Sequence, residues 1–293
     1  MKVAVDLQPD QQAARWDHHV AVYEAVFEPL TNAFARRALD RLELHAGDRL
    51  LDVGAGSGGA ALIAAARGVD VLAVDASDRM VARLRERAAL QPVSGRIDAE
   101  IMDGMALTVP DASFDAAISV FGVILFPDPG LGMREIARVL KPGGRAAIVT
   151  WTAIERYELV ARLQAAIAKV RGPQPPPKVL PAQLRFREEA AFRGLLTDAG
   201  LVVQDIVQLE ERWRVPSARW LADHIAFAPG MAAMAEALGA DRAPVLEAFV
   251  SALERDQGAG EVVLSAVAHA GFAMKPRAEN PPRATHHQGM TNK

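Results

Sequence analysis

The sequence predicts an α/β fold of the Rossmann-like kind. The expected architecture is a seven-stranded, mostly parallel sheet with helices on both faces, preceded by N-terminal helices and interrupted late in the chain by a helical cap. Short apolar runs alternate with helical stretches from residue 49 to residue 151. A glycine-rich turn at residues 54–58 follows the first apolar run and opens an alanine-rich helix. This strand–helix–strand spacing indicates parallel βαβ units around a buried sheet.

The first 45 residues are expected to form an N-terminal helical lid. Residues 1–15 are polar and predict a loose segment. Residues 16–43 carry apolar side chains at roughly helical spacing. Pro29 is expected to split this stretch into two helices, because proline removes a backbone donor and clashes with the preceding turn.

Residues 46–151 are expected to form the cofactor-binding core. Its strands are predicted at 49–53, 70–75, 98–102, 114–120 and 145–151, and its helices at 58–67, 77–90 and 130–140. Ser77 or Asp78 is a suitable N-cap for the second helix. The sequence KPGG at residues 141–144 is expected to stop the third helix before the fifth strand begins.

The pattern changes after Trp151, and residues 152–276 are expected to complete the sheet and carry the cap. Helices are predicted at 152–171 and 186–199, strands at 201–209 and 261–274, and helical structure at 217–256. The stretch 171–181 contains five prolines and a glycine, which predicts a loop. The polar residues 277–293 are expected to be a disordered tail.

Composition excludes several classes of protein. The 293 residues carry a formal net charge of −3, which disfavours a nucleic-acid partner. The chain has no cysteine, so disulfides, thiolate metal sites and a cysteine nucleophile are excluded. No metal-ligand spacing is present, and the longest apolar run, 116–127, is too short to cross a membrane. We therefore expect a cytoplasmic protein with no bound metal, either a monomer or a homodimer.

The glycine-rich turn predicts a nucleotide-like ligand. Glycine allows a sharp backbone turn and lets a ligand approach without meeting a Cβ. Asp75 ends the next predicted strand, about 20 residues on, where a carboxylate accepts hydrogen bonds from ribose hydroxyls. Because Gly54, Gly56 and Gly59 also satisfy the dinucleotide pattern G-x-G-x-x-G, the turn by itself leaves NAD open as the ligand.

Four motifs in order across about 100 residues carry a family resemblance. Residues 49–58 read RLLDVGAGSG and Asp75 follows; residues 103–115 read DGMALTVPDASFD; residues 138–144 read RVLKPGG, before AAIVTW. This order resembles class I S-adenosylmethionine-dependent methyltransferases, and the nearest branch is the ubiquinone/menaquinone-type and small-molecule methyltransferases. The resemblance favours S-adenosylmethionine over NAD as the cofactor, with S-adenosylhomocysteine as product.

The resemblance also implies roles for matched positions. The turn backbone would face the amino-acid part of the cofactor, Asp52 its ammonium, Asp75 its ribose, and Asp103 its adenine amino group. In similar enzymes the N-terminal helix closes over the cofactor, and Tyr23 would reach its carboxylate. The expected cofactor-binding residues are Tyr23, Asp52, Gly54, Ala55, Gly56, Asp75, Ala76, Met80, Asp103, Gly104, Met105, Ser119 and Val120.

The acceptor pocket is expected to be apolar and aromatic. Residues at or just past strand ends follow from sheet geometry, whereas Tyr157 and the cap residues depend on helices predicted after Trp151. His224, in the predicted cap, is the candidate general base. Many similar enzymes place a histidine shortly after the fourth strand, whereas residues 121–126 are apolar here, which counts against a base in that loop. The expected pocket residues are Phe121, Val123, Phe126, Trp151, Tyr157, Trp220, His224 and Phe227.

These observations predict methyl transfer to a small organic, apolar or aromatic acceptor by direct displacement. A sulfonium is a good leaving group, so positioning carries much of the rate, and a base is needed only when the acceptor must lose a proton. Two alternatives stay open: a non-catalytic cofactor-binding protein on the same fold, and a nicotinamide-dependent oxidoreductase.

Overall fold

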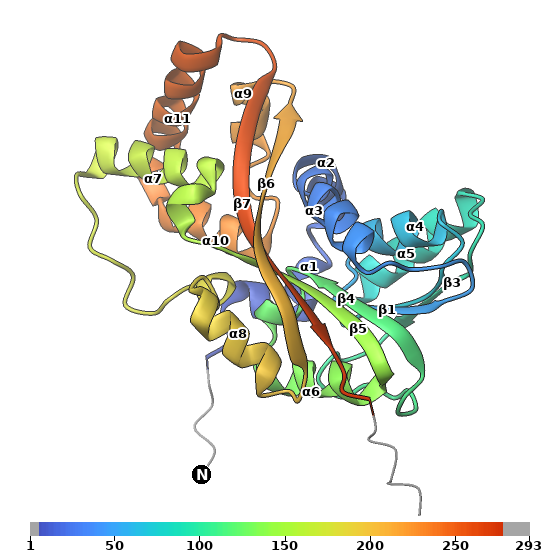
Figure 1. Cartoon of the computed structure of the whole chain (residues 1–293). Coiled ribbons are helices and arrows are strands. Elements are labelled where there is room, and N and C mark those ends of the chain that lie inside the picture. The colour runs from blue at the N-terminus through green and yellow to red at the C-terminus, as the bar shows by residue number, and fades with distance from the viewer. Residues whose placement is uncertain (1–5, 278–293) are drawn as a thin grey trace, which may run out of the picture.

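A computed structural model describes residues 6–277 of the chain (Figure 1). The predicted tail therefore lies outside the described residues from position 278 onward. Within residues 6–277, no helix is long and apolar enough to span a membrane.

The fold is built on one seven-stranded sheet, as predicted. Its strands lie in the order β3-β2-β1-β4-β5-β7-β6. The neighbours from β3 to β5 pair in parallel, whereas β7 lies antiparallel between β5 and β6. The strands are β1 (Arg49–Val53), β2 (Asp70–Asp75), β3 (Ile97–Ile101), β4 (Phe114–Val120), β5 (Leu140–Trp151), β6 (Val202–Val215) and β7 (Val262–Met274).

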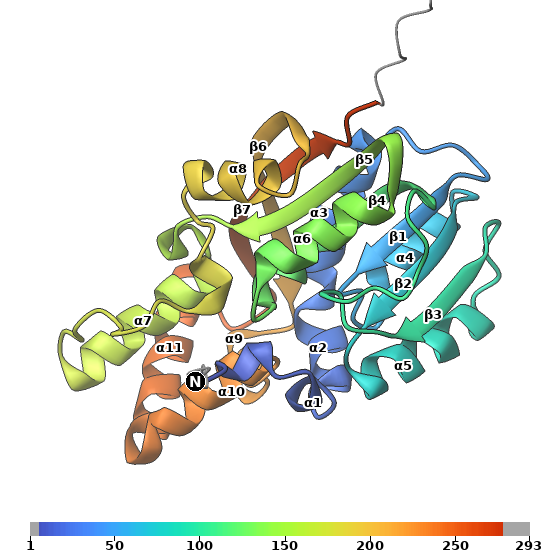
Figure 2. The same cartoon turned by 90° about the horizontal axis from the view of Figure 1, so that it is seen from below.

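Helices cover both faces of the sheet, as predicted (Figure 2). One face carries α3 (Glu28–Arg41), α4 (Gly59–Ala65) and α5 (Asp78–Leu90); the other carries α6 (Pro129–Val139) and α8 (Glu189–Thr197). Ser77 is the N-cap of α5, and its hydroxyl accepts a hydrogen bond from the Met80 amide at 3.2 Å. The central strands β1 and β4 are buried on both sides because helices pack against each face.

The N-terminal region differs in part from the prediction. A break at Phe27 separates α2 (Val20–Val26) from α3, with Pro29 in the first turn of α3, as expected. The segment predicted to be loose is ordered from residue 6 onward, and it contains the 3-10 turn η1 (Pro9–Gln11) and the helix α1 (Ala13–Trp16). Long-range side-chain bonds, described below, hold this polar segment in place.

Three other elements have different bounds from those predicted. The strand β5 begins at Leu140, and the KPGG sequence forms the irregularity in the β4–β5 register, between the pairs Phe114–Leu140 and Ala116–Arg145. The predicted helix 152–171 is a short turn, η3 (Ile154–Arg156), followed by α7 (Glu158–Arg171). The strand β6 continues to Val215, because its second half pairs with β7 beyond the end of β5.

The cap lies between β6 and β7, as predicted, and consists of α9 (Ala218–Asp223), α10 (Pro229–Ala237) and α11 (Arg242–Gln257). The paired strands β6 and β7 extend from the sheet toward these helices (Figure 1). Helix α11 packs against both α7 and α9. The cap, α7 and the N-terminal helices therefore meet beyond the carboxyl ends of the parallel strands, which is where ligands of open α/β sheets bind.

Candidate functional site

One large cavity, of about 1200 Å³, lies at this edge of the sheet. Its floor is made by the ends of β1, β2, β4 and β5, and its roof by the N-terminal segment, α7 and α10. Small-molecule sites commonly measure about 300–1,000 Å³, so this space is large enough for a cofactor and a second molecule together.

The glycine-rich turn forms one wall of the cavity with bare backbone. Gly54 and Gly56 have φ angles of +70° and +56°, a region that favours glycine. A Cβ on Gly54 would lie 2.8 Å from the Cα of Gly122, so the turn also approaches the end of β4 closely. A Cβ on Gly56 would point at the ring of Tyr23, 4.0 Å away. The space between Gly56 and Tyr23 is therefore bounded by an amide backbone and a phenol.

Asp75 lies beside the turn and ties it to the end of β2. One of its carboxylate oxygens accepts a hydrogen bond from the Gly56 amide at 2.8 Å, and the other accepts one from the Ser77 amide at 2.9 Å. A carboxylate has about four lone-pair sites, so acceptor capacity remains for ligand hydroxyls. Burial raises the pKa of Asp75, and the backbone amides that donate to it oppose this shift.

A short turn after β3 forms the next part of the wall. Asp103 accepts a hydrogen bond from the Met105 amide at 2.8 Å, which leaves the backbone of Gly104 against the cavity. A Cβ on Gly104 would collide with the ring of Phe126. This turn and Phe126 therefore bound a narrow space next to Met80, which also lines the cavity.

Charged pairs hold the N-terminal helices over this half of the cavity. The Ser77 hydroxyl donates to Asp17 at 2.6 Å, and Arg83 on α5 pairs with Glu24 on α2 at 2.9 Å. The hydroxyl of Tyr23 shares a hydrogen bond of 3.3 Å with Thr31. The lid is thus fixed to the helix that follows Asp75.

The opposite half of the cavity is aromatic. The rings of Phe121, Trp151 and Tyr157 stack in sequence, with centroid separations of 4.0 and 4.7 Å. Phe27 from the lid stacks on Phe227 from the cap at 5.0 Å. Phe121 holds a φ of +59°, a conformation that is strained for a bulky residue and often marks a functional site. Segments far apart in the chain thereby build one apolar chamber.

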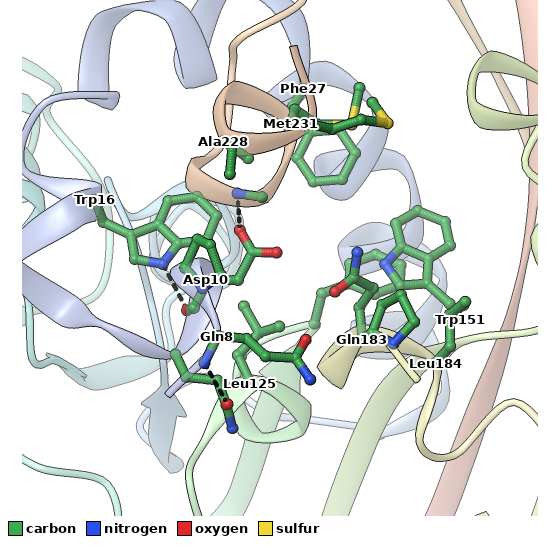
Figure 3. A pocket seen from close by; sticks show the side chains of 18 of the residues that line it. Gln8, Asp10, Trp16, Phe27, Leu125, Trp151, Gln183, Leu184, Ala228 and Met231 are labelled. Carbon is green, nitrogen blue, oxygen red and sulfur yellow. Dashed lines mark hydrogen bonds between the residues drawn. The ribbon is translucent and has the colours of Figure 1, made fainter. Parts of the chain in front are cut away.

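Polar side chains on the rim of this chamber come from segments that the sequence analysis did not assign to the site. Gln8 and Asp10 project from η1, and Gln183 projects from the turn after the proline-rich loop (Figure 3). Among the described residues, no lysine, arginine or histidine lines the cavity. The chamber therefore offers hydrogen bonds and negative charge, but no cationic partner for an anionic ligand.

Comparison with known proteins identifies the family. Residues 51–148 match the methyltransferase domain model. The chain is 40% identical over 134 residues to 27-O-demethylrifamycin SV methyltransferase of Amycolatopsis mediterranei, covering 45% of this chain and 48% of that protein. It is 32% identical over 158 residues to phosphatidylethanolamine N-methyltransferase of Cereibacter sphaeroides, covering 53% of this chain and 73% of that protein. The chain belongs to the class I S-adenosylmethionine-dependent methyltransferases.

Solved structures agree with this fold. The cyclase SpnF superposes with a TM-score of 0.59 at 21% identity, covering 94% of this chain and all of that one. The match to the rifamycin enzyme spans only about half of that protein's length. Sequence similarity between this chain and the rifamycin enzyme is thus confined to part of each protein.

S-adenosylmethionine is the methyl donor that membership of this family implies. Two features of the methyltransferase fit S-adenosylmethionine: the glycine-rich turn presents backbone without side chains to the cavity, and the buried carboxyl group of Asp52 lies beneath that turn. Asp52 is 1% exposed, and its Oδ2 has no hydrogen-bond partner among the described residues. Burial, together with the charge of Asp75, raises the pKa of Asp52 to about 7. A buried acceptor without a partner is costly; because Asp52 lies behind the turn and does not line the cavity, a cationic ligand group would offset that cost through its charge and not by direct contact.

Most residues expected at the methyltransferase site line this one cavity. The cavity-lining members are Tyr23, Gly54, Gly56, Asp75, Ala76, Met80, Asp103, Gly104, Met105, Val120, Phe121, Phe126, Trp151, Tyr157 and Phe227. Their roles toward the cofactor and acceptor remain proposals.

Several expected residues do not reach the cavity. Asp52 and Ala55 lie behind the turn. Ser119 is fully buried; its hydroxyl donates to the Val53 carbonyl at 2.7 Å and accepts from the Val123 amide at 3.0 Å, so it joins β1 to β4. Val123 is part of the core. The prediction that Ser119 and Val123 face ligands is therefore wrong.

The cap residues Trp220 and His224 also lie outside the cavity lining. Their rings stack on each other at 4.4 Å, and Nδ1 of His224 lies 2.8 Å from the Trp220 carbonyl. Helix α9 turns this pair away from the cavity, while the loop after it brings in Phe227, so the structure gives no support to His224 as a base and that role stays an untested prediction. The helical periodicity of the sequence does not show which way the side chains of a helix as short as α9 point.

Proposed function

We propose that the protein transfers a methyl group from S-adenosylmethionine to a neutral, largely apolar small molecule. The observation that carries this proposal is the continuity of the cavity from the Gly56–Asp75 wall to the stack of Phe121, Trp151 and Tyr157. Two of the relatives are named for O-methylation of a rifamycin and N-methylation of a phospholipid, so they support a small-molecule acceptor but do not agree on the atom methylated.

The residues of the chamber act mainly by positioning. When bound, S-adenosylmethionine supplies an electrophilic methyl group on a sulfonium. The aromatic faces stabilise positive charge in a dry site and hold a flat acceptor in one orientation. The lid and cap exclude water, which strengthens the electrostatic interactions inside the cavity. The absence of a cation from the described lining disfavours carboxylate or phosphate acceptors, because their charge would be buried unpaired.

A panel experiment tests this proposal. The protein is incubated with methyl-labelled S-adenosylmethionine and matched pairs of polycyclic molecules, each pair consisting of a carboxylic acid and its neutral methyl ester, with the same free hydroxyl or amino group on both members to accept the methyl group. We expect label in neutral members and little in the acids. The test variant is Trp151→Ala, which should lower methyl transfer by opening the aromatic stack. Its S-adenosylhomocysteine binding, which should stay nearly unchanged, is the internal control. Cofactor binding with no transfer to any member would favour the non-catalytic alternative, and transfer confined to acids would contradict the proposed acceptor class.

A further inference from the structure

Residues 8–11, which include η1, cross the cavity and are held there by three hydrogen bonds; this segment is called the strap below. The side-chain oxygen of Gln8 accepts from the Ala182 amide at 2.8 Å, and the side-chain amide of Gln11 donates to the Phe126 carbonyl at 3.3 Å. The carboxylate of Asp10 accepts from the Gly230 amide at 2.7 Å, at the start of α10. The strap thereby brings an acidic side chain into the roof, next to the apolar side chains of α10 (Figure 3).

The carboxylate of Asp10 keeps acceptor capacity that the fold does not use. Among residues 6–277, the Gly230 amide is its hydrogen-bond donor, through Oδ1. Figure 3 shows the second oxygen pointing into the open cavity, toward the side where Gln183 and Trp151 lie. Burial raises the pKa of Asp10, while the Gly230 amide and the charge of His19 oppose this shift. Asp10 is half-buried, and a partly desolvated carboxylate with a free oxygen is a stronger base than an exposed one.

Asp10 is also connected to the cofactor half of the cavity. The indole nitrogen of Trp16 donates to the Asp10 carbonyl at 2.9 Å, and the ring of Trp16 packs edge-on against Tyr23 with centroids 6.0 Å apart. Tyr23 in turn faces Gly56 of the glycine-rich turn. The strap is thus positioned through two aromatic side chains that also bound the expected cofactor space.

We propose that Asp10 binds the hydroxyl group of the methyl acceptor and accepts its proton, so that the reaction is an O-methylation of a neutral, otherwise apolar alcohol or phenol. This inference rests on the proposed methyltransferase function. The hydroxyl oxygen forms a bond to the methyl carbon, the carbon–sulfur bond breaks with its electron pair passing to sulfur, and the hydroxyl proton passes to the Asp10 carboxylate. The products are a methyl ether, a neutral thioether and a protonated Asp10.

The chemistry of the surrounding wall favours a neutral hydroxyl compound. Gln11, Gln164 and Gln183 line the cavity with side-chain amides, which both donate and accept, as hydroxyl and carbonyl groups require. Phe27 and Met231 offer apolar surface for the body of the molecule (Figure 3). An acceptor that carried a negative charge would be repelled by Asp10 and would find no cationic partner in the described lining.

The test uses four probes on one skeleton: pyrenebutanol, its methyl ether, pyrenebutylamine and pyrenebutyric acid. Each is titrated into the full-length protein saturated with S-adenosylhomocysteine. We expect the alcohol to bind about tenfold or more tightly than the ether, because a hydrogen bond to a charged group is lost in the ether. The Asp10→Asn variant should reduce this preference to about twofold or less, since the charge is gone. It should also lower kcat for the alcohol about 100-fold.

The matched control is Asp6→Asn, an exposed carboxylate on the same segment that does not line the cavity; it should keep the preference and the rate. Unchanged S-adenosylhomocysteine affinity and thermal unfolding in Asp10→Asn show that the fold is intact. Equal binding of alcohol and ether, no binding of the alcohol, tighter binding of the amine, or a wild-type rate in Asp10→Asn would each overturn the inference. Failure of wild type to bind S-adenosylhomocysteine would instead overturn the proposed function.

Discussion

Replacing Asp75 by alanine should weaken cofactor binding by an amount that the structure allows us to bound. The carboxylate holds the amides of Gly56 and Ser77 at 2.8 and 2.9 Å, so its loss frees the glycine-rich turn as well as removing the proposed ribose acceptor. Hydrogen bonds to charged groups contribute about 1.5–3 kcal/mol each. For the ligand we expect a loss of about 1–3 kcal/mol, which is about 5- to 150-fold in Kd.

Isothermal titration of S-adenosylhomocysteine into wild type and variants measures this loss directly. Asp75→Asn should bind almost as weakly as the alanine variant, because its NH₂ group would face a backbone amide donor. The matched control is Asp70→Ala at the opposite end of β2, where the carboxylate accepts from the Arg96 amide at 2.9 Å. It should leave the Kd unchanged. A wild-type Kd in folded Asp75→Ala would refute the role assigned to this carboxylate.

Three further outcomes follow from the structure. The native pKa of Asp52 is about 7 and its unfolded value is about 4, so between these pH values the native state binds a proton that the unfolded state does not, and the free energy of unfolding should fall as pH rises. Urea titrations at pH 5 and 8 should show a smaller fall in the free energy of unfolding for Asp52→Asn than for wild type. An equal fall in both would contradict this. Glu28→Ala removes the nearer carboxylate partner of Arg87, at 2.5 Å, and leaves Glu24 at 3.6 Å and the Ser57 carbonyl as its partners. It should lower the free energy of unfolding by about 1.5–3 kcal/mol, partly recovered in the double variant with Arg87→Met. A loss within error of zero would show that this pair is not important. Gly104→Val should raise the Kd for S-adenosylhomocysteine at least about tenfold, because the valine side chain would meet the ring of Phe126. Adding Phe126→Ala should restore part of the affinity. Unchanged affinity in Gly104→Val would show that Gly104 is not part of the binding site.

The central part of the fold was predictable from the sequence because burial on both faces produces a strong signal there. The bounds of β1, β2 and β4 agree with those predicted from their apolar runs. The end of β6 was missed because residues 210–212 are three charged residues in a row and apolar side chains return only at alternate positions after them, where the strand pairs with β7. Trp213 and Val215, both buried, are the signal in the sequence that could have extended this strand.

The residues expected to bind the cofactor were predictable from motifs, and the aromatic wall was predictable from the ends of the strands, whereas the polar rim of the chamber was not. Asp10 lies in a polar segment without periodicity. The sequence Gln8-Pro9-Asp10 predicts a turn, but it does not show that the turn docks on Gly230, 220 residues away. His224 was misplaced because its orientation depends on how α9 packs, which local sequence does not fix. Long-range contacts between polar segments therefore position the residues that we propose to select the acceptor.

A crystal structure of the protein with S-adenosylhomocysteine would test the central claim most directly. The account predicts the ligand in the cavity, with its ribose hydroxyls within hydrogen-bond distance of the Asp75 carboxylate and its amino-acid part against the backbone of Gly54 and Gly56. The sulfur would point toward the chamber of Trp151 and Asp10, and space for an acceptor would remain there. A ligand bound elsewhere, or one whose sulfur faced away from this chamber, would contradict the account.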